Sequence, residues 1–165
     1  MVRFLFPWWS VVVIQMSQSD ARMTITAQSL TNGLSMTVQT LILEPNPLQR
    51  RLLVELLSRQ PGMALVGVAS TLEETLALCR SRRPDLVVAG LGPALFHGLE
   101  TIHQIKECQP QTRILALLDM DDERYREAAR LQGATYCVAK TALGRQLGST
   151  LEDVKREVSP SAEPA

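Results

Sequence analysis

The sequence predicts an α/β domain with a five-stranded, parallel, doubly wound sheet and five helices. Between Val38 and Val158, short apolar runs alternate with stretches whose leucines recur at helical spacing. Two of the runs, Leu86–Ala89 and Ile114–Leu118, are almost continuously apolar, which is typical of strands covered on both faces. Alternation of this kind predicts parallel strands joined by right-handed crossover helices in a single domain.

The first strand is predicted at Val38–Leu43, and the chain then runs directly into a helix. Glu44-Pro45-Asn46-Pro47 ends the strand, and Pro47 suits the first turn of a helix, where its missing N–H has no partner to lose. Leucines at 3.6-residue spacing form the apolar stripe of that helix, which ends at Pro61-Gly62. A second strand is predicted at Ala64–Ala69.

The later elements follow from capping residues and apolar stripes. Ser70 or Thr71 begins the second helix, because Thr71 and Glu74 stand at capping-box spacing. Gly133 suits the left-handed residue that closes a helix. The remaining ranges are a helix ending at Arg82, a strand at Leu86–Ala89, a helix from about Leu99 to Cys108, a strand at Ile114–Leu118, a helix from Asp121 or Asp122 to Gly133, a strand at Thr135–Ala139 and a helix from Leu143 to Val158.

Composition argues against several classes of function. The 17 basic and 17 acidic residues balance, so no basic field predicts nucleic-acid binding. The three cysteines and two histidines form no C-x-x-C pair or other ligand spacing, so no metal site is expected. Scattered cysteines without a pairing pattern are typical of a reducing compartment. We therefore expect a cytoplasmic protein that binds neither nucleic acid nor a membrane.

Residues 1–36 differ in composition from the rest, because four of the seven aromatic residues lie in the first nine positions. The apolar stretch 4–16 is shorter than the roughly 20 residues of a transmembrane helix but has the size of a signal-peptide core. Three explanations stay open: a start codon assigned too far upstream of Met23 or Met36, a signal or membrane-surface anchor, or a disordered extension. Residues 159–165 are predicted to be a disordered tail.

Four stretches of the chain carry a family resemblance: LILEPNPLQRRLLVELL, RRPDLVVAGL, HGLETIHQIKE and RLQGATYCVAK. The resemblance they carry covers residues 38–158, about three quarters of the chain, and runs through with hardly a gap between the strand ends. They resemble the receiver domain of bacterial response regulators, the CheY-like, flavodoxin-like domain of two-component systems. The resemblance implies the fold predicted above and a non-enzymatic role in phosphorelay signal transduction.

In that family a histidine kinase phosphorylates an aspartate at the end of the third strand. Two acidic residues after the first strand hold Mg²⁺ beside it, while a Ser or Thr ending the fourth strand and a lysine ending the fifth contact the phosphoryl group. Position by position, the resemblance places the acidic pair on Glu44 and Pro45 and the phospho-acceptor on Gly90. It places the hydroxyl on Leu118 and the lysine on Lys140.

Three of these five positions depart from the family in ways that remove its chemistry. Gly90 has no side chain on which an acyl phosphate can form. Leu118 cannot donate a hydrogen bond, and Pro45 leaves Glu44 as the single carboxylate for Mg²⁺. We therefore expect a degenerate site with no catalytic residue, no metal and lost or very weak Mg²⁺ binding. Glu44 and Lys140 are expected to form a salt bridge across the vacated pocket.

Other carboxylates are not expected to replace the acceptor. Asp85 stands at the start of its strand, roughly 16 Å from Gly90 at about 3.3 Å per residue. Asp119, Asp121 and Asp122 follow the fourth strand and are interpreted as helix caps and solvated charges.

The expected contact surface, by resemblance, consists of the fourth helix, the fifth strand and the fifth helix, and it can also form a homodimer. Tyr125, Tyr136, Cys137 and Arg145 are assigned to it. Cys137 stands at the family's aromatic position, and Tyr136, one residue away, is expected to face the other side of the sheet.

The sequence favours a pseudo-receiver that binds a protein partner, such as a sensor kinase or another regulator, without being phosphorylated. Two alternatives stay open. One is a small-ligand or anion-binding domain that uses the vacated pocket and Lys140. The other is a truncated remnant of a receiver plus helix-turn-helix transcriptional regulator.

Overall fold

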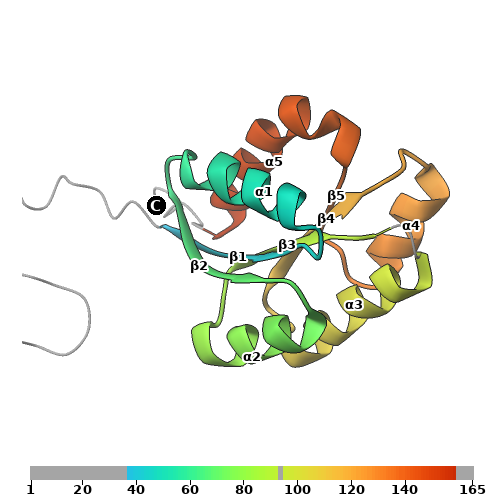
Figure 1. Cartoon of the computed structure of the whole chain (residues 1–165), viewed down its shortest axis with the longest axis horizontal. Helices are drawn as coiled ribbons and strands as arrows, with labels where there is room; N and C mark the ends of the chain where they lie inside the picture. The colour runs from blue at the N-terminus through green and yellow to red at the C-terminus, as the bar shows by residue number, and fades with distance from the viewer. Residues whose placement is uncertain (1–36, 93–94, 159–165) are drawn as a thin grey trace, which may run out of the picture. The chain divides into compact units, whose positions relative to one another are not determined.

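The computed structural model describes residues 37–92 and 95–158, and the predicted extension 1–36 and tail 159–165 lie outside them. In the described residues, five parallel strands form one sheet in the order β2-β1-β3-β4-β5 (Figure 1). The predicted α/β class and the doubly wound sheet are confirmed. The elements are β1 (Val38–Leu43), α1 (Pro47–Ser58), β2 (Met63–Ala69), α2 (Leu72–Arg82), β3 (Leu86–Gly90), α3 (Leu95–Cys108), β4 (Arg113–Leu118), α4 (Glu123–Leu131), β5 (Tyr136–Ala139), the 3-10 turn η2 (Lys140–Ala142) and α5 (Leu143–Val158).

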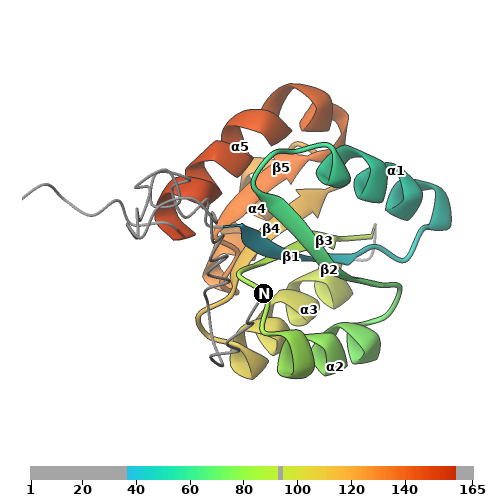
Figure 2. The same cartoon turned by 90° about the vertical axis from the view of Figure 1, so that its left-hand side faces the viewer.

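Helices cover both faces of the sheet. Helices α1 and α5 lie on one face, and α2, α3 and α4 lie on the other (Figures 1 and 2). The central strand β3 is buried along its whole length, as its apolar sequence predicts. Its side chains alternate between two cores: Val87 and Ala89 pack with the α2–α4 face, and Leu86 and Val88 pack with the α1–α5 face.

The helix starts follow local capping chemistry. Asn46 accepts hydrogen bonds from the N–H groups of Leu48 (3.0 Å) and Gln49 (3.1 Å), with Pro47 as the first helical residue of α1. Thr71, one of the two predicted candidates, caps α2 by accepting from the N–H of Glu74.

The prediction that the third helix begins near Leu99 is wrong, because α3 already begins at Leu95. Gly98, a residue that disfavours helix by propensity, lies inside the helix. A β-carbon on Gly98 would lie 3.1 Å from Cβ of Leu91 and 3.2 Å from the hydroxyl of Tyr125. Glycine is therefore used here for close packing of α3 against its neighbours rather than for a helix start.

The carboxyl ends of the strands meet at one edge of the sheet. Leu43 at the end of β1 pairs with Ala89 of β3, so Glu44 and Gly90 follow side by side. Leu118 of β4 pairs with Ala139 of β5, so Asp119 and Lys140 follow side by side. In the part of the chain that the structure describes, no helix combines the length and the apolar character needed to cross a membrane.

Candidate functional site

Glu44 turns its side chain into the edge of the sheet. The residue is buried, with 2% of its surface exposed. Its Oε1 accepts a hydrogen bond from the N–H of Asn46 at 3.0 Å, within the short loop between β1 and α1. Its Oε2 is buried and receives no hydrogen bond from the described residues, although the ammonium of Lys140 lies 3.3 Å away. The loop between β1 and α1 thus places a buried carboxylate at the carboxyl ends of the strands.

Gly90 lies directly against that carboxylate. A β-carbon on Gly90 would come within 1.8 Å of Oε2 and 2.6 Å of Cδ of Glu44, far inside van der Waals contact. The space beside the α-carbon of Gly90 therefore already holds the Glu44 carboxylate. A side chain on residue 90 requires Glu44 to move.

The ammonium group of Lys140 lies close to oxygen atoms of three different segments. Its Nζ lies 2.8 Å from Oδ1 of Asp119 after β4, 2.8 Å from Oε1 of Gln49 in α1, and 3.3 Å from Oε2 of Glu44 after β1. Only 17% of the lysine side chain is exposed. The predicted pair of Glu44 and Lys140 is confirmed, but the interpretation of Asp119 as a cap or solvated charge is wrong, because it is an ion-pair partner of Lys140.

The other carboxylates near β4 behave as expected. Asp122 caps α4 by accepting from the N–H of Arg124 at 2.8 Å. Asp121 pairs with Arg126, but its side chain is 62% exposed and remains a solvated charge, whereas that of Asp119 is 29% exposed. Asp85 binds the N–H of Gln39 at 2.8 Å near the starts of β1 and β3, at the opposite edge of the sheet. Asp119 is the one of these four carboxylates that faces Lys140.

The family resemblance implies Mg²⁺ beside these residues, but the groups present do not fit that ion. Mg²⁺ takes oxygen ligands in octahedral geometry. Here the carboxylates of Glu44 and Asp119 face the Lys140 ammonium, and Arg50 donates hydrogen bonds to the carbonyl oxygens of Glu44 (2.8 Å) and Pro45 (3.1 Å). The two carboxylates thus face an ammonium, and the two carbonyl oxygens already accept hydrogen bonds from a guanidinium. No group of three or more His, Cys, Asp or Glu side chains able to hold a metal is found within 37–92 and 95–158.

Leu118 and Pro45, the remaining positions of the candidate pocket, differ in burial. Leu118 is fully buried and packs in the core on the α2–α4 face. Pro45 is exposed at the start of the loop after β1. Neither side chain carries a polar group, so the polar part of the site consists of Glu44, Asp119 and Lys140 together with Gln49.

The predicted contact surface needs correction. Tyr125 is buried, 7% exposed, and its hydroxyl has no hydrogen-bond partner among the described residues, because α4 turns this face toward α3 and Gly98. Burial also raises the pKa of the Tyr125 hydroxyl. Cys137 is half-buried in the core on that side of the sheet, and desolvation raises the pKa of its thiol. Arg145 is exposed on α5.

Tyr136 faces the other side of the sheet, as predicted, and is tied to the end of α5. Its hydroxyl donates a 2.6 Å hydrogen bond to Glu157, which also pairs with Arg113 at 2.9 Å. The hydrogen bonds from Tyr136 and Arg113 lower the pKa of the Glu157 carboxyl. Tyr136 thus joins β5 to α5 and is only partly available to a partner.

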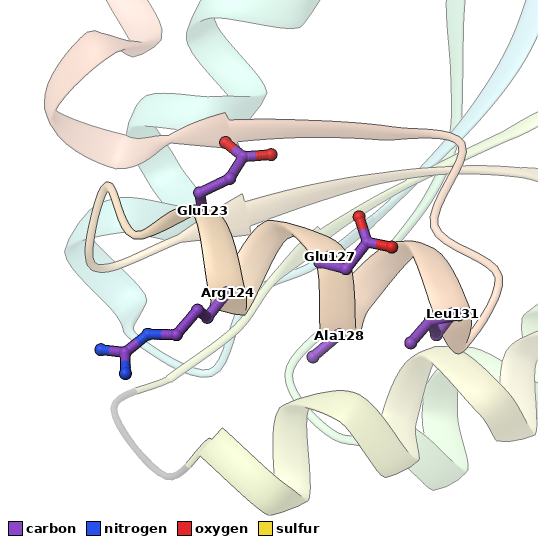
Figure 3. Close-up of a pocket in the computed structure, with 5 residues that line it drawn as sticks. All are labelled: Glu123, Arg124, Glu127, Ala128 and Leu131. Carbon is purple, nitrogen blue, oxygen red and sulfur yellow. The ribbon is translucent and has the colours of Figure 1, made fainter.

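Two surface depressions lie away from the strand ends. One follows α4 and is drawn in Figure 3, where Ala128 and Leu131 point to the side of the helix that faces α3. It is lined by Glu123, Arg124, Glu127, Ala128 and Leu131. The other lies between α2 and α3 and is lined by Leu76, Arg80, Glu100, Gln104, Glu107 and Cys108. Leu131 at the end of α4 is 77% exposed, and Met120 in the loop before α4 is 63% exposed.

Comparison with known families identifies the domain. A model of the response regulator receiver domain matches residues 40–152, and the chain belongs to this family. Among solved structures, a two-component response regulator of the LuxR family from an Aurantimonas species superposes with a TM-score of 0.65 and 26% identity, covering 73% of this chain and 86% of the other. The signal receiver domain of the putative response regulator NarL from Mycobacterium tuberculosis has the same fold, with a TM-score of 0.64, 21% identity, and coverage of 73% and 97%.

Two curated relatives share part of their length with this chain. One is the DNA-binding transcriptional activator DevR/DosR of Mycobacterium tuberculosis, 28% identical over 71% of this chain and 54% of that protein. The other is the nitrate/nitrite response regulator protein NarL of Escherichia coli K12, 30% identical over 57% of this chain and 44% of that protein. The chain spans about half the length of these relatives.

Proposed function

We propose that this chain is a pseudo-receiver that works through protein contacts and is not switched by phosphorylation. The observation that carries the proposal is the position of the Glu44 carboxylate against Gly90, where a β-carbon would lie 1.8 Å from Oε2. In the family resemblance, residue 90 is the phospho-acceptor. Glycine offers no nucleophile there, and the neighbouring carboxylate already takes the place of a side chain.

The other carboxylates of the site are poor substitutes for an acceptor. Attack on a phosphodonor needs an accessible carboxylate and a cation to balance the phosphoryl charge. Glu44 is buried, and Asp119 is bound by the same Lys140 that would have to contact the phosphoryl group. Because the ligand that biases the receiver equilibrium has no place to bind, the domain stays in one conformation.

The proposed partner is a cytoplasmic protein, a sensor kinase or another regulator. The exposed surface of α4 supports this assignment, because Leu131 is an exposed apolar side chain beside the charged residues Glu123, Arg124 and Glu127. Met120, in the loop before α4, is a second exposed apolar side chain. Arg145 extends the same proposed surface onto α5. A second copy of the chain is an alternative occupant, and light scattering separates the two.

The two alternatives have different support. A small ligand in the strand-end pocket is disfavoured, because the Glu44 carboxylate lies in that space. The receiver part of a DNA-binding regulator is the second candidate, because DevR/DosR, described as DNA-binding, matches this chain over 54% of its length. A DNA mobility-shift assay with the full chain at low salt tests it, since binding through phosphate contacts is strongest there.

The experiment for the main proposal is intact-mass analysis after incubation with acetyl phosphate and Mg²⁺. The unaltered chain should keep its mass, while a receiver domain with an aspartate at the acceptor position gains one phosphoryl group in the same tube. A phosphoryl group added to the unaltered chain would overturn the proposal, and peptide mapping would then name the residue that carries it.

A further inference from the structure

We infer that the strand-end site around Lys140 and Gly90 is an anion-binding site whose ligand is the chain's own Glu44 carboxylate. The inference builds on the proposed function, because it says what fills the pocket of a receiver that takes no phosphoryl group. The ligands that fit this site are small carboxylate anions. The Glu44 side chain ends in the same group and is attached to the chain itself.

The cationic part of the site is the Lys140 ammonium, which faces three oxygen atoms. A lysine ammonium has three donors and no acceptor. Nζ of Lys140 faces Gln49 and Asp119 at 2.8 Å each and Glu44 at 3.3 Å. Gln49 and Asp119 hold the ammonium from two sides, so the third direction is left for an anion above Gly90.

The carboxylate itself is held at both oxygen atoms. Oε1 of Glu44 accepts from the N–H of Asn46 at 3.0 Å, and Oε2 faces Lys140. A backbone N–H on one oxygen and an ammonium near the other together recognise a carboxylate group, not merely a negative charge. Oε2 has no hydrogen-bond donor of its own among the described residues, so its position depends on Lys140 and on the missing side chain of Gly90.

Removal of this carboxylate should therefore leave a receptor for a free anion. Glu44→Ala removes the carboxylate and the methylene groups that carry it. It keeps the N–H of Asn46, the Lys140 ammonium and the space beside the α-carbon of Gly90. Acetate and formate have the matching group. In the unaltered chain the tethered carboxylate competes at a high effective concentration, so a free anion gains no binding.

The test is the melting temperature of Glu44→Ala in sodium acetate or formate against sodium chloride at equal ionic strength and pH. An anion present at about ten times its dissociation constant should raise the melting temperature by about 4 °C. Glu44→Gln is the matched control, because its amide fills the same volume and leaves no room for acetate. The unaltered chain is the second control, and neither control should respond. Glu44→Ala combined with Lys140→Met should lose the response.

Two results of this experiment would contradict the inference. An equal response of Glu44→Ala, Glu44→Gln and the unaltered chain, or no response of any, overturns the inference. If Glu44→Ala does not fold in chloride, its refolding yield in acetate against chloride gives the same decision. Absence of rescue leaves the proposed function intact, whereas a phosphoryl group gained by the unaltered chain overturns the proposed function directly.

Discussion

Gly90 and Glu44 share one space: Oε2 of Glu44 lies 1.8 Å from the point where a β-carbon of Gly90 would stand. The two residues lie at the carboxyl ends of neighbouring strands, since the residues before them, Ala89 and Leu43, are paired in the sheet. The acceptor position and the acidic position beside it are therefore complementary in this chain. Residue 90 has no side chain, and the Glu44 carboxylate lies where one would begin.

Gly90→Ala should destabilise the domain by about 1 to 3 kcal/mol, because the added methyl group overpacks a filled site. In a Glu44→Ala background the same change should cost less, giving a coupling energy of about 1 kcal/mol or more in a double-mutant cycle from urea unfolding. Gly92→Ala is the control, because no atom of the described residues lies within 4 Å of a β-carbon there. Additive free energies of unfolding would show that Glu44 does not occupy the space.

Lys140→Met should cost about 2 to 4 kcal/mol, because it leaves the buried Glu44 carboxylate without its cation. Lys155→Met is a matched control: its side chain is 19% exposed, close to the 17% of Lys140, but its partner Glu152 is 58% exposed. The control should lose less than about 1 kcal/mol. Equal losses of unfolding free energy in the two variants would contradict a buried ionic site at Lys140.

The link between Tyr136 and Glu157 should make stability depend on pH at the acid end. The pKa of Glu157 is lowered in the folded state, so its contribution is present above its unfolded pKa of about 4.3 and is lost as the pH falls through the folded value. Tyr136→Phe removes the donor and should cost less than about 1 kcal/mol at pH 7. Denaturant midpoints from pH 7 to pH 3 should show this difference closing below about pH 4. A difference that stays constant with pH would refute the link.

Gly148→Ala should stabilise the domain by about 0.5 to 1 kcal/mol, because residue 148 lies in the exposed part of α5. Within 37–92 and 95–158, no atom lies within 4 Å of a β-carbon at this position. Gly133→Ala is the opposite case. Its φ is +106° and a β-carbon would lie 2.7 Å from Cγ of Lys106, so this variant should lose stability. Thermal unfolding of the two variants should give shifts of opposite sign.

The fold was predictable because its signals are local. The apolar run marks β3, Pro47 marks the first turn of α1, and Thr71 caps α2. Each signal lies within or next to the element that it marks. The start of α3 was mispredicted because Gly98 is chosen for its contact with Tyr125, a residue of another helix. A helix-breaking propensity cannot be separated from close packing without the neighbour in view.

The candidate site was only half predictable. The pair of Glu44 and Lys140 could be expected from their places after two strands. The role of Asp119 could not, because it depends on which oxygen atoms Lys140 reaches across the sheet edge. The burial of Tyr125 was not predicted for a similar reason, because the packing of α4 against α3 determines which side of α4 is buried. A local sequence pattern does not show which side chains from distant segments come into contact.

The most direct measurement of the central claim is an amide NMR titration of the unaltered chain with Mg²⁺ and the phosphoryl mimic beryllium trifluoride. If the Glu44 carboxylate fills the pocket, the amide signals of Gly90, Asp119, Lys140 and α4 should not move, while those of a receiver with an acceptor aspartate do. Saturable shifts at these residues, lost on Lys140→Met, would contradict the account.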